Sequence, residues 1–129
     1  MTGNSVALDT SVAIDVLAGR AEPLTSQPIT EFLLPVIVIG ELRYGALNSR
    51  RADENLAEVE RLVARCRVMD VSTTTAEVYA RLRLSLKQKG KPIPENDLWI
   101  ASLCVESQVR LAAVDAHFDA IDGLNRIDF

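Results

Sequence analysis

Aromatic residues make up only 5% of the chain, so its core must be built from aliphatic side chains. No apolar run approaches the roughly 20 residues that cross a bilayer. The N-terminal segment lacks the basic stretch, apolar stretch and small-residue cleavage site of a secreted protein. Cys66 and Cys104 stand alone, without a C-x-x-C pair or a histidine cluster, which favours reduced core cysteines. These absences predict a cytosolic protein that does not cross a membrane.

Catalytic groups other than carboxylates are equally scarce. His117 is the only histidine, and its place beside Phe118 indicates a structural role, so no serine–histidine or cysteine–histidine pair is available. The chain also lacks a glycine-rich phosphate-binding loop. Its 129 residues carry a net charge of −4. This acidic balance counts against a module that binds nucleic acid through charge alone, but not against a nuclease whose acidic site is neutralised by divalent cations.

Short apolar runs alternate with helical patterns along the chain. We expect short strands at 5–9, 32–35, 67–71 and 111–115, and an edge strand at 125–129. Helical patterns and turn residues predict a loop at 20–31 and helices at 10–17, in the later part of 36–47, at 52–66, from Ser72 or Thr73 to Lys87, at 95–107 and, for one turn, at 117–121. This alternation predicts a single domain over 1–129, an α/β fold in which a central parallel sheet is covered on both faces as a three-layer α/β/α sandwich.

Two acidic residues occupy equivalent places at strand ends. Asp9 and Asp115 each close a buried strand and immediately precede a helix. The carboxyl ends of parallel strands meet at one edge of a sheet, and ligands bind outside that edge. Each Asp could instead do no more than cap the following helix, which is a common role for this residue. Two acids in equivalent places shift the balance towards a shared site.

Two further acids interrupt helical faces that are otherwise apolar. Glu41 shares its face with Ile37, Val38, Tyr44 and Gly45. A glutamate on an apolar face needs a partner, and Arg43, only two residues away, does not face it on a helix, so a metal ion is the better partner. Asp97 shares its face with Ile100, Ala101 and Cys104. Capping of the helix start and a functional role explain Asp97 equally well.

The four carboxylates together predict a metal site. Carboxylates gathered within a few ångströms repel one another, and at least one pKa rises unless a cation lies between them. Mg²⁺ and Mn²⁺ prefer oxygen ligands, and such ions can activate water and orient a phosphodiester. Because no other catalytic apparatus is available, the sequence predicts metal-assisted hydrolysis.

Four segments of the chain, in this order, resemble the four acidic motifs of the PIN-domain family. They are L-D-T-S-V-A-I-D, G-E-L-R-Y-G-A, E-N-D-L-W-I-A and V-D-A-H-F-D-A-I-D-G-L. The short length and the G-E-L-R-Y-G segment are similar to the VapC-type members, which are ribonuclease toxins of toxin–antitoxin pairs. The resemblance covers essentially the whole chain and implies a PIN-like fold.

The resemblance also implies a mechanism and a set of site residues. The activity would be that of a metal-dependent endoribonuclease, in which a metal-activated water hydrolyses RNA and leaves a 5′-phosphate and a 3′-hydroxyl. Thr10 or Ser11 would hydrogen-bond the site, and Asp119 is a possible fifth acid, although a solvated helix face is the alternative. The family often has Thr or Ser where this chain has Ala113, so a supporting hydroxyl is missing. The implied ligands of Mg²⁺ (or Mn²⁺) are Asp9, Glu41, Asp97 and Asp115.

The expected partners follow from the same resemblance. They are an RNA substrate, a VapB-like antitoxin whose tail would lie in a hydrophobic groove and place a basic side chain near the acids, and a second copy in a two-fold dimer. Leu42, Tyr44 and Trp99 permit such a groove, although each could equally belong to the core. Basic side chains remain available at Arg43, Lys87, Lys89, Lys91 and Arg110, of which the first four are candidates for contacts with the RNA backbone.

Two other interpretations remain open at this point. A phosphoacceptor receiver domain has similar length, fold class and Mg²⁺ chemistry, but it should carry two adjacent acids after its first strand and an Asp after its third. This chain has one acid after its first strand, and Asp70 is expected within the strand at 67–71. A PIN-like module that binds a partner without cleaving RNA is the second alternative.

Overall fold

The computed structural model describes residues 4–20 and 28–129. Most of the loop expected at 20–31 therefore lies outside the described residues. Within them, the chain order of strands, helices and one short 3₁₀ helix is β1 (Ser5–Leu8), α1 (Thr10–Leu17), β2 (Glu31–Pro35), α2 (Val36–Leu47), α3 (Ala52–Arg65), β3 (Arg67–Met69), α4 (Thr73–Lys89), α5 (Glu95–Ser107), β4 (Arg110–Ala112), η1 (Ala116–Ala120) and β5 (Arg126–Ile127).

The five strands form one parallel sheet in the order β3-β2-β1-β4-β5. The order runs outward in one direction through β2 and β3 and in the other through β4 and β5. The crevice between β1 and β4 is therefore the point at which the topology reverses, where open α/β sheets bind ligands. A receiver domain has the order 2-1-3-4-5, so the strand order excludes that alternative.

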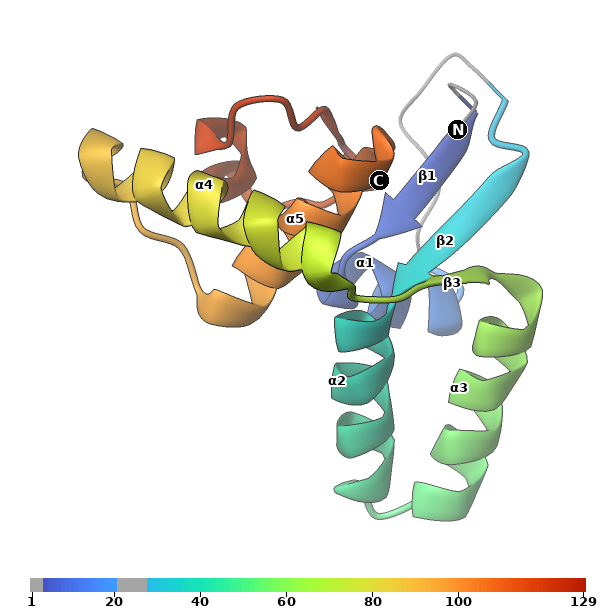
Figure 1. Ribbon diagram of the computed structural model, residues 1–129. Coiled ribbons are helices and arrows are strands. Elements are labelled where there is room, and N and C mark those ends of the chain that lie inside the picture. The colour runs from blue at the N-terminus through green and yellow to red at the C-terminus, as the bar shows by residue number, and fades with distance from the viewer. Residues whose placement is uncertain (1–3, 21–27) are drawn as a thin grey trace.

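Helices cover both faces of the sheet, as the three-layer prediction requires (Figure 1). Right-handed crossovers place the connections that run towards β3 on one face and those that run towards β5 on the other. In Figure 1, α4 and α5 lie together on one side, whereas α2 and α3 form a hairpin that extends away from the sheet. No helix among the described residues is both long and apolar enough to span a membrane.

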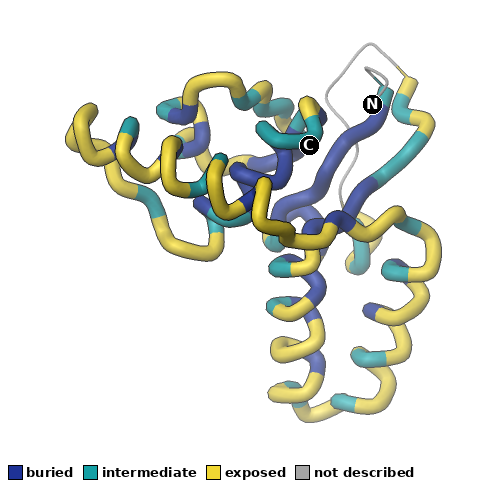
Figure 2. The backbone as a smooth tube through the Cα atoms, viewed as in Figure 1, coloured by how far each residue is buried: buried dark blue, intermediate teal, exposed yellow. Residues whose placement is uncertain are grey.

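Burial and capping explain where the elements lie. β1 is buried along its whole length, as expected for a central parallel strand, and the outward sides of α3 and α4 are exposed (Figure 2). α4 begins with a capping box between Ser72 and Thr75 and ends at Gly90, whose φ of 67° favours glycine. β3 ends at Met69, so the expectation that Asp70 lies within this strand is wrong. The partner strand β2 ends at Pro35, which pairs with Met69, so no strand residue lies opposite Asp70.

Candidate functional site

Asp9 and Asp115 lie at the topological crevice, one after β1 and the other after β4. Asp9 is buried, with 6% of its surface exposed, and its Oδ1 accepts a hydrogen bond of 2.8 Å from the backbone N–H of Val12. Oδ1 of Asp115 accepts one of 2.9 Å from the N–H of His117. Both residues therefore cap the helices that follow them. Capping engages one carboxylate oxygen in each case, so it does not exclude a role in a shared site.

Glu41 reaches the crevice from α2. The hydroxyl of Thr10 donates a hydrogen bond of 2.6 Å to Oε1 of Glu41, which ties the first turn of α1 to the middle of α2. The apolar face expected around Glu41 is only partly buried, because Val38 is fully buried whereas Ile37 is half-buried and Tyr44 is 68% exposed. The buried face of α2 carries Leu42 and its neighbours instead. Glu41 therefore lines an open cleft rather than the core.

Asp97 enters from the first turn of α5, where its side chain is 28% exposed. The His117 ring lies between two of the acids, with Nδ1 3.0 Å from Oδ2 of Asp115 and Nε2 3.1 Å from Oδ2 of Asp97. Nε2 is buried, and despite its short distance to Asp97 it makes no hydrogen bond of regular geometry. Sequence reasoning gave His117 a structural role and missed this position. Its place two residues after Asp115 was the available signal.

The charges of the four carboxylates act on one another. Burial raises the pKa of the Asp9 carboxyl from 3.8 to about 6; the hydrogen bond from Val12 opposes this shift, and the charges of Asp97, Asp115 and Glu41 add to it. Burial also raises the pKa of Asp97, with further contributions from Glu41 and Asp115 and an opposing one from His117. The four acids are therefore close enough to repel, as expected from the sequence.

The donor set fits a hard divalent cation. Over residues 4–20 and 28–129, no lysine or arginine forms an ion pair with Asp9, Glu41, Asp97 or Asp115. Mg²⁺ and Mn²⁺ favour carboxylate oxygens of this kind. In the same part of the chain, no three acidic, histidine or cysteine side chains stand in a ready-made ligand geometry. The hydroxyl of Thr10 holds Glu41, and the ring of His117 lies against Asp97 and Asp115. Binding of an ion therefore requires these side chains to reorient.

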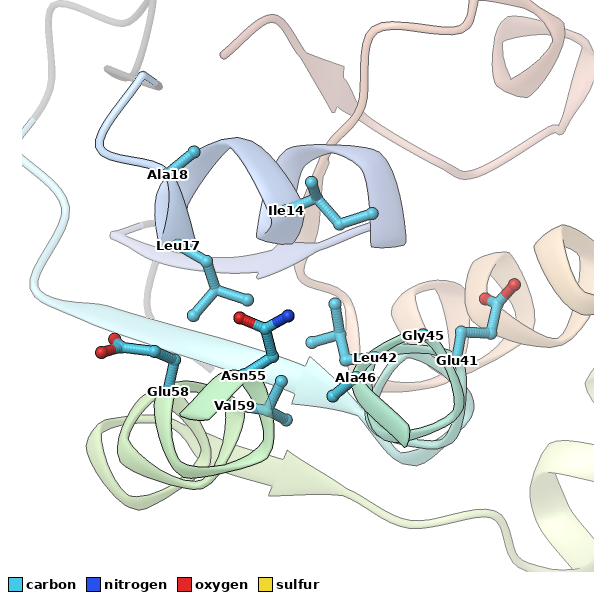
Figure 3. Close-up of a pocket in the computed structure, with 10 residues that line it drawn as sticks. All are labelled: Ile14, Leu17, Ala18, Glu41, Leu42, Gly45, Ala46, Asn55, Glu58 and Val59. Atoms are coloured by element: carbon cyan, nitrogen blue, oxygen red, sulfur yellow. The ribbon is translucent and has the colours of Figure 1, made fainter. Parts of the chain in front are cut away.

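Two cavities flank α2. One, of about 540 Å³, lies beside the acids and is lined by Thr10, Ile37, Gly40, Glu41, Tyr44 and Asn96. The other, of about 410 Å³, lies between α1, α2 and α3. In Figure 3 the side chains of Leu17, Leu42 and Val59 point towards one another in this second cavity, whereas the carboxylate of Glu41 points away from them. The apolar and acidic cavities thus lie on adjoining faces of α2, and Glu41 lines both of them.

Several residues singled out from the sequence lie elsewhere. Arg43 is engaged by Glu60 of α3 through hydrogen bonds of 2.7 and 3.0 Å, and Lys89 binds the carbonyl of Ala120 and the carboxylate of Asp122. These two basic side chains are therefore poorly available to a second molecule. Within the described residues, the four acids have no hydrogen bond or ion pair with Lys87, Lys91 or Ser11.

The remaining expectations concern the C-terminal segment and the groove. Asp119 is paired with Arg126 at 2.9 and 3.2 Å, which holds the pKa of its carboxyl below the usual value, so it stands apart from the other acids. Ala113 is fully buried. Of the three apolar residues suggested for the groove, Leu42 lines the apolar cavity, Tyr44 lines the acidic one, and Trp99 stacks on Tyr79 with ring centroids 4.0 Å apart.

Comparisons with known proteins cover almost the whole chain. The family model described as PIN domain matches residues 6–124. Ribonuclease VapC5 of Mycobacterium tuberculosis is 32% identical over 130 residues, which span 94% of this chain and 90% of that protein. The tRNA(fMet)-specific endonuclease VapC of Salmonella typhimurium is 31% identical over 97 residues, or 73% of this chain and 74% of that protein.

Solved structures give the same picture. The chain superposes on the crystal structure of DNA-bound VapBC from Salmonella typhimurium with a TM-score of 0.85 and 27% sequence identity. That match covers 96% of this chain and 97% of the other. The similarity therefore extends over the sheet, the helices that flank it and the segments that carry the four acids.

Proposed function

The chain belongs to the PIN-domain family, and on that premise we propose that it is a metal-dependent endoribonuclease that acts as the toxin of a type II toxin–antitoxin pair. The two relatives named above are a ribonuclease and a tRNA-specific endonuclease, which supports RNA as the substrate. The solved relative is a VapBC assembly, which supports pairing with an antitoxin. Action in the cytoplasm and a two-fold dimer belong to the proposal as well.

The observation that carries the proposal is a group of four carboxylates that, in the described part of the chain, pairs with no lysine or arginine and has only His117 beside two of its members. Asp9 is almost fully buried, and the three other acids raise its pKa further. A protein without a use for this arrangement would gain stability by replacing a buried acid with an amide or an apolar side chain. One buried acid with three further acids beside it at the topological crevice therefore supports a bound cation and chemistry on a phosphodiester.

The chain's own residues have distinct tasks in this scheme. Asp9, Glu41, Asp97 and Asp115 would hold Mg²⁺ or Mn²⁺. When bound, the ion lowers the pKa of water and neutralises charge on the phosphodiester. The hydroxyl of Thr10 orients Glu41 through its 2.6 Å hydrogen bond. The backbone N–H groups at the helix starts fix one oxygen of Asp9 and of Asp115, which limits the orientations open to the other oxygen.

Hydrolysis of RNA by purified protein tests the proposal. We expect cleavage of single-stranded RNA in Mg²⁺, its loss with a chelator, and its loss in Asp97→Asn, with the circular dichroism spectrum unchanged. The matched control is Asp70→Asn, because Asp70 also follows a parallel strand and is exposed, but it does not contribute to the pKa of Asp9 or Asp97. Equal cleavage by Asp97→Asn and the wild type would mean that a contaminating nuclease is being measured and would contradict the proposal. A PIN-like module without activity would bind an antitoxin but leave RNA intact.

The apolar cavity between α1, α2 and α3 is our candidate for the antitoxin's apolar segment. Its lining includes Leu17, Leu42 and Val59, and Ile14 at its edge is 48% exposed (Figure 3). Glu41 borders this cavity from the acidic side, so a segment seated there could bring a basic side chain towards the acids. Inhibition by the antitoxin would then combine apolar burial with a cation that competes for the carboxylates.

Ile14→Glu tests this assignment without touching the acids. Ile14 is exposed, and substitutions at exposed positions usually change the free energy of unfolding by less than about 0.5 kcal/mol, so the variant should fold. We expect unchanged RNA cleavage and weaker inhibition by the co-expressed antitoxin. Leu84→Glu, at a 55% exposed position on α4, is the control and should keep full inhibition. If both variants are inhibited equally, the antitoxin binds elsewhere.

A further inference from the structure

The wall of the acidic cavity that α2 forms carries other side chains besides its one carboxylate, Glu41. Ile37, Gly40, Glu41 and Tyr44 are spaced three or four residues apart, so they share the face of α2 that lines this cavity. Asn96, next to Asp97 on α5, lines it from the opposite side. The volume of about 540 Å³ falls within the range of small-ligand sites.

Among the described residues, Tyr44 is the most exposed of the large hydrophobic residues, with an exposed fraction of 68%. Neither the side chain of Tyr44 nor that of Asn96 forms a hydrogen bond, ion pair or ring contact with another side chain or backbone group of residues 4–20 and 28–129. The other tyrosine differs in both respects, because Tyr79 stacks on Trp99 and hydrogen-bonds Glu95. A free aromatic ring and a free amide thus face a cavity beside the four acids.

The surface beside Tyr44 is open as well. A Cβ added at Gly40 would meet no atom within 4 Å, so this glycine is not required by packing and leaves the helix face bare. One carboxylate and no basic side chain line the cavity, which disfavours a phosphate group there. A nucleobase is neutral, flat and rich in hydrogen-bonding groups, so it matches an aromatic ring with an amide opposite.

We propose that Tyr44 stacks on an unpaired nucleobase next to the scissile phosphate, and that the Asn96 amide hydrogen-bonds the edge of that base. This inference rests on the proposed function, because the acids define where the phosphate lies. The substrate class it names is single-stranded RNA or an RNA loop, since a base within a duplex must first lose its pairing and stacking to lie on the ring, which costs free energy. Tyr44 is a substrate-binding residue in this scheme and takes no part in bond cleavage.

RNA binding by variants of Tyr44 tests the inference. All variants are made in the Asp97→Asn background, and the probe is a short single-stranded RNA of random sequence, labelled with fluorescein or carrying 2-aminopurine. Tyr44→Leu keeps an apolar side chain but loses the flat ring, and it should raise the Kd roughly 5- to 150-fold, as expected for one lost base–aromatic stack. It should also abolish the quenching of 2-aminopurine fluorescence. Tyr44→Phe keeps the ring and should stay within about twofold of the parent.

Leu47→Ala is the matched control, because Leu47 is 63% exposed on the same helix but does not line the cavity. It should leave the Kd and the quenching unchanged. Equal RNA affinity of the parent and Tyr44→Leu would overturn the inference while leaving the proposed function intact. So would a Tyr44→Leu variant that loses only antitoxin binding, because the ring would then contact a protein. If wild type does not cleave RNA and the parent does not bind it, the proposed function itself fails.

Discussion

Replacing Asp9 with asparagine should stabilise the metal-free protein at neutral pH. Burial and the neighbouring acids raise the pKa of Asp9 from 3.8 to about 6. Each pKa unit corresponds to about 1.4 kcal/mol, so the ionised carboxylate costs the folded state about 2 to 3 kcal/mol at pH 7. Asparagine is neutral and can still accept the hydrogen bond from the N–H of Val12, so the cap of α1 is kept.

The pH dependence has a defined sign. Because the folded state binds the proton on Asp9 more tightly than the unfolded chain does, the wild type loses stability from this group as the pH rises from about 4 to about 6. The advantage of Asp9→Asn should therefore be absent near pH 4 and complete by pH 7. The difference in unfolding free energy between wild type and Asp9→Asn cancels the titrating groups that do not interact with Asp9 and keeps those of its acidic neighbours.

Urea unfolding in a chelator at several pH values measures the effect, with Asp70→Asn as the exposed control. A saturating divalent ion should then reverse the trend, because a ligand at 100 times its Kd adds about 2.7 kcal/mol to a protein that binds it. The wild type should gain this stability and Asp9→Asn should gain less. An asparagine variant that is less stable than the wild type in chelator at pH 7 would refute the reasoning from burial and repulsion.

Three further predictions follow from individual contacts. Thr10→Val removes the hydroxyl that holds Glu41 and should lower RNA cleavage about 10-fold or more, whereas Thr10→Ser should keep activity in the same assay. Gly40→Ala should raise the free energy of unfolding by roughly 1 kcal/mol in urea titrations, since alanine favours helix and its Cβ meets open space. Arg126→Met should lower the melting temperature at pH 7, because it removes the partner that holds the pKa of Asp119 below its usual value of 3.8. The difference in melting temperature between wild type and variant should narrow below about pH 3.8, because the pairing is lost as Asp119 is protonated.

The strands and helices could be predicted because their patterns are local. α1 was expected at 10–17 and α3 at 52–66, and they occupy Thr10–Leu17 and Ala52–Arg65. Ser72, expected as one of two possible caps of α4, is the residue that caps it. β2 ends at Pro35 as expected, whereas the four other strands end one to three residues earlier than expected, because apolar composition predicts burial but not where a ladder stops.

The position of the acids was partly predictable as well. Asp9 and Asp115 follow neighbouring parallel strands, so their meeting at one edge follows from the fold. Glu41 lies beside the other acids, but the apolar face expected around it is buried only in part, since Val38 is buried and Tyr44 is exposed. A helical pattern tells which residues share a face, but whether that face meets the core depends on how the helix is docked.

The contact of His117 with Asp97 could not be predicted from the neighbouring sequence. Its proximity to Asp115 is local, since two residues separate them at a helix start. Its contact with Asp97 depends on how η1 packs against the first turn of α5, which is a tertiary relationship. The pairing of Arg43 with Glu60 is another such case, because it joins two helices of a hairpin.

The location of a bound divalent ion tests the central claim most directly. Crystals of the wild type soaked in Mn²⁺ would show the ion by its anomalous scattering. We predict a peak at the carboxyl edge of β1 and β4, within ligand distance of carboxylate oxygens from Asp9 and at least one of Glu41, Asp97 and Asp115. A saturating soak that gives no peak there, or gives one only at other carboxylates, would contradict the account.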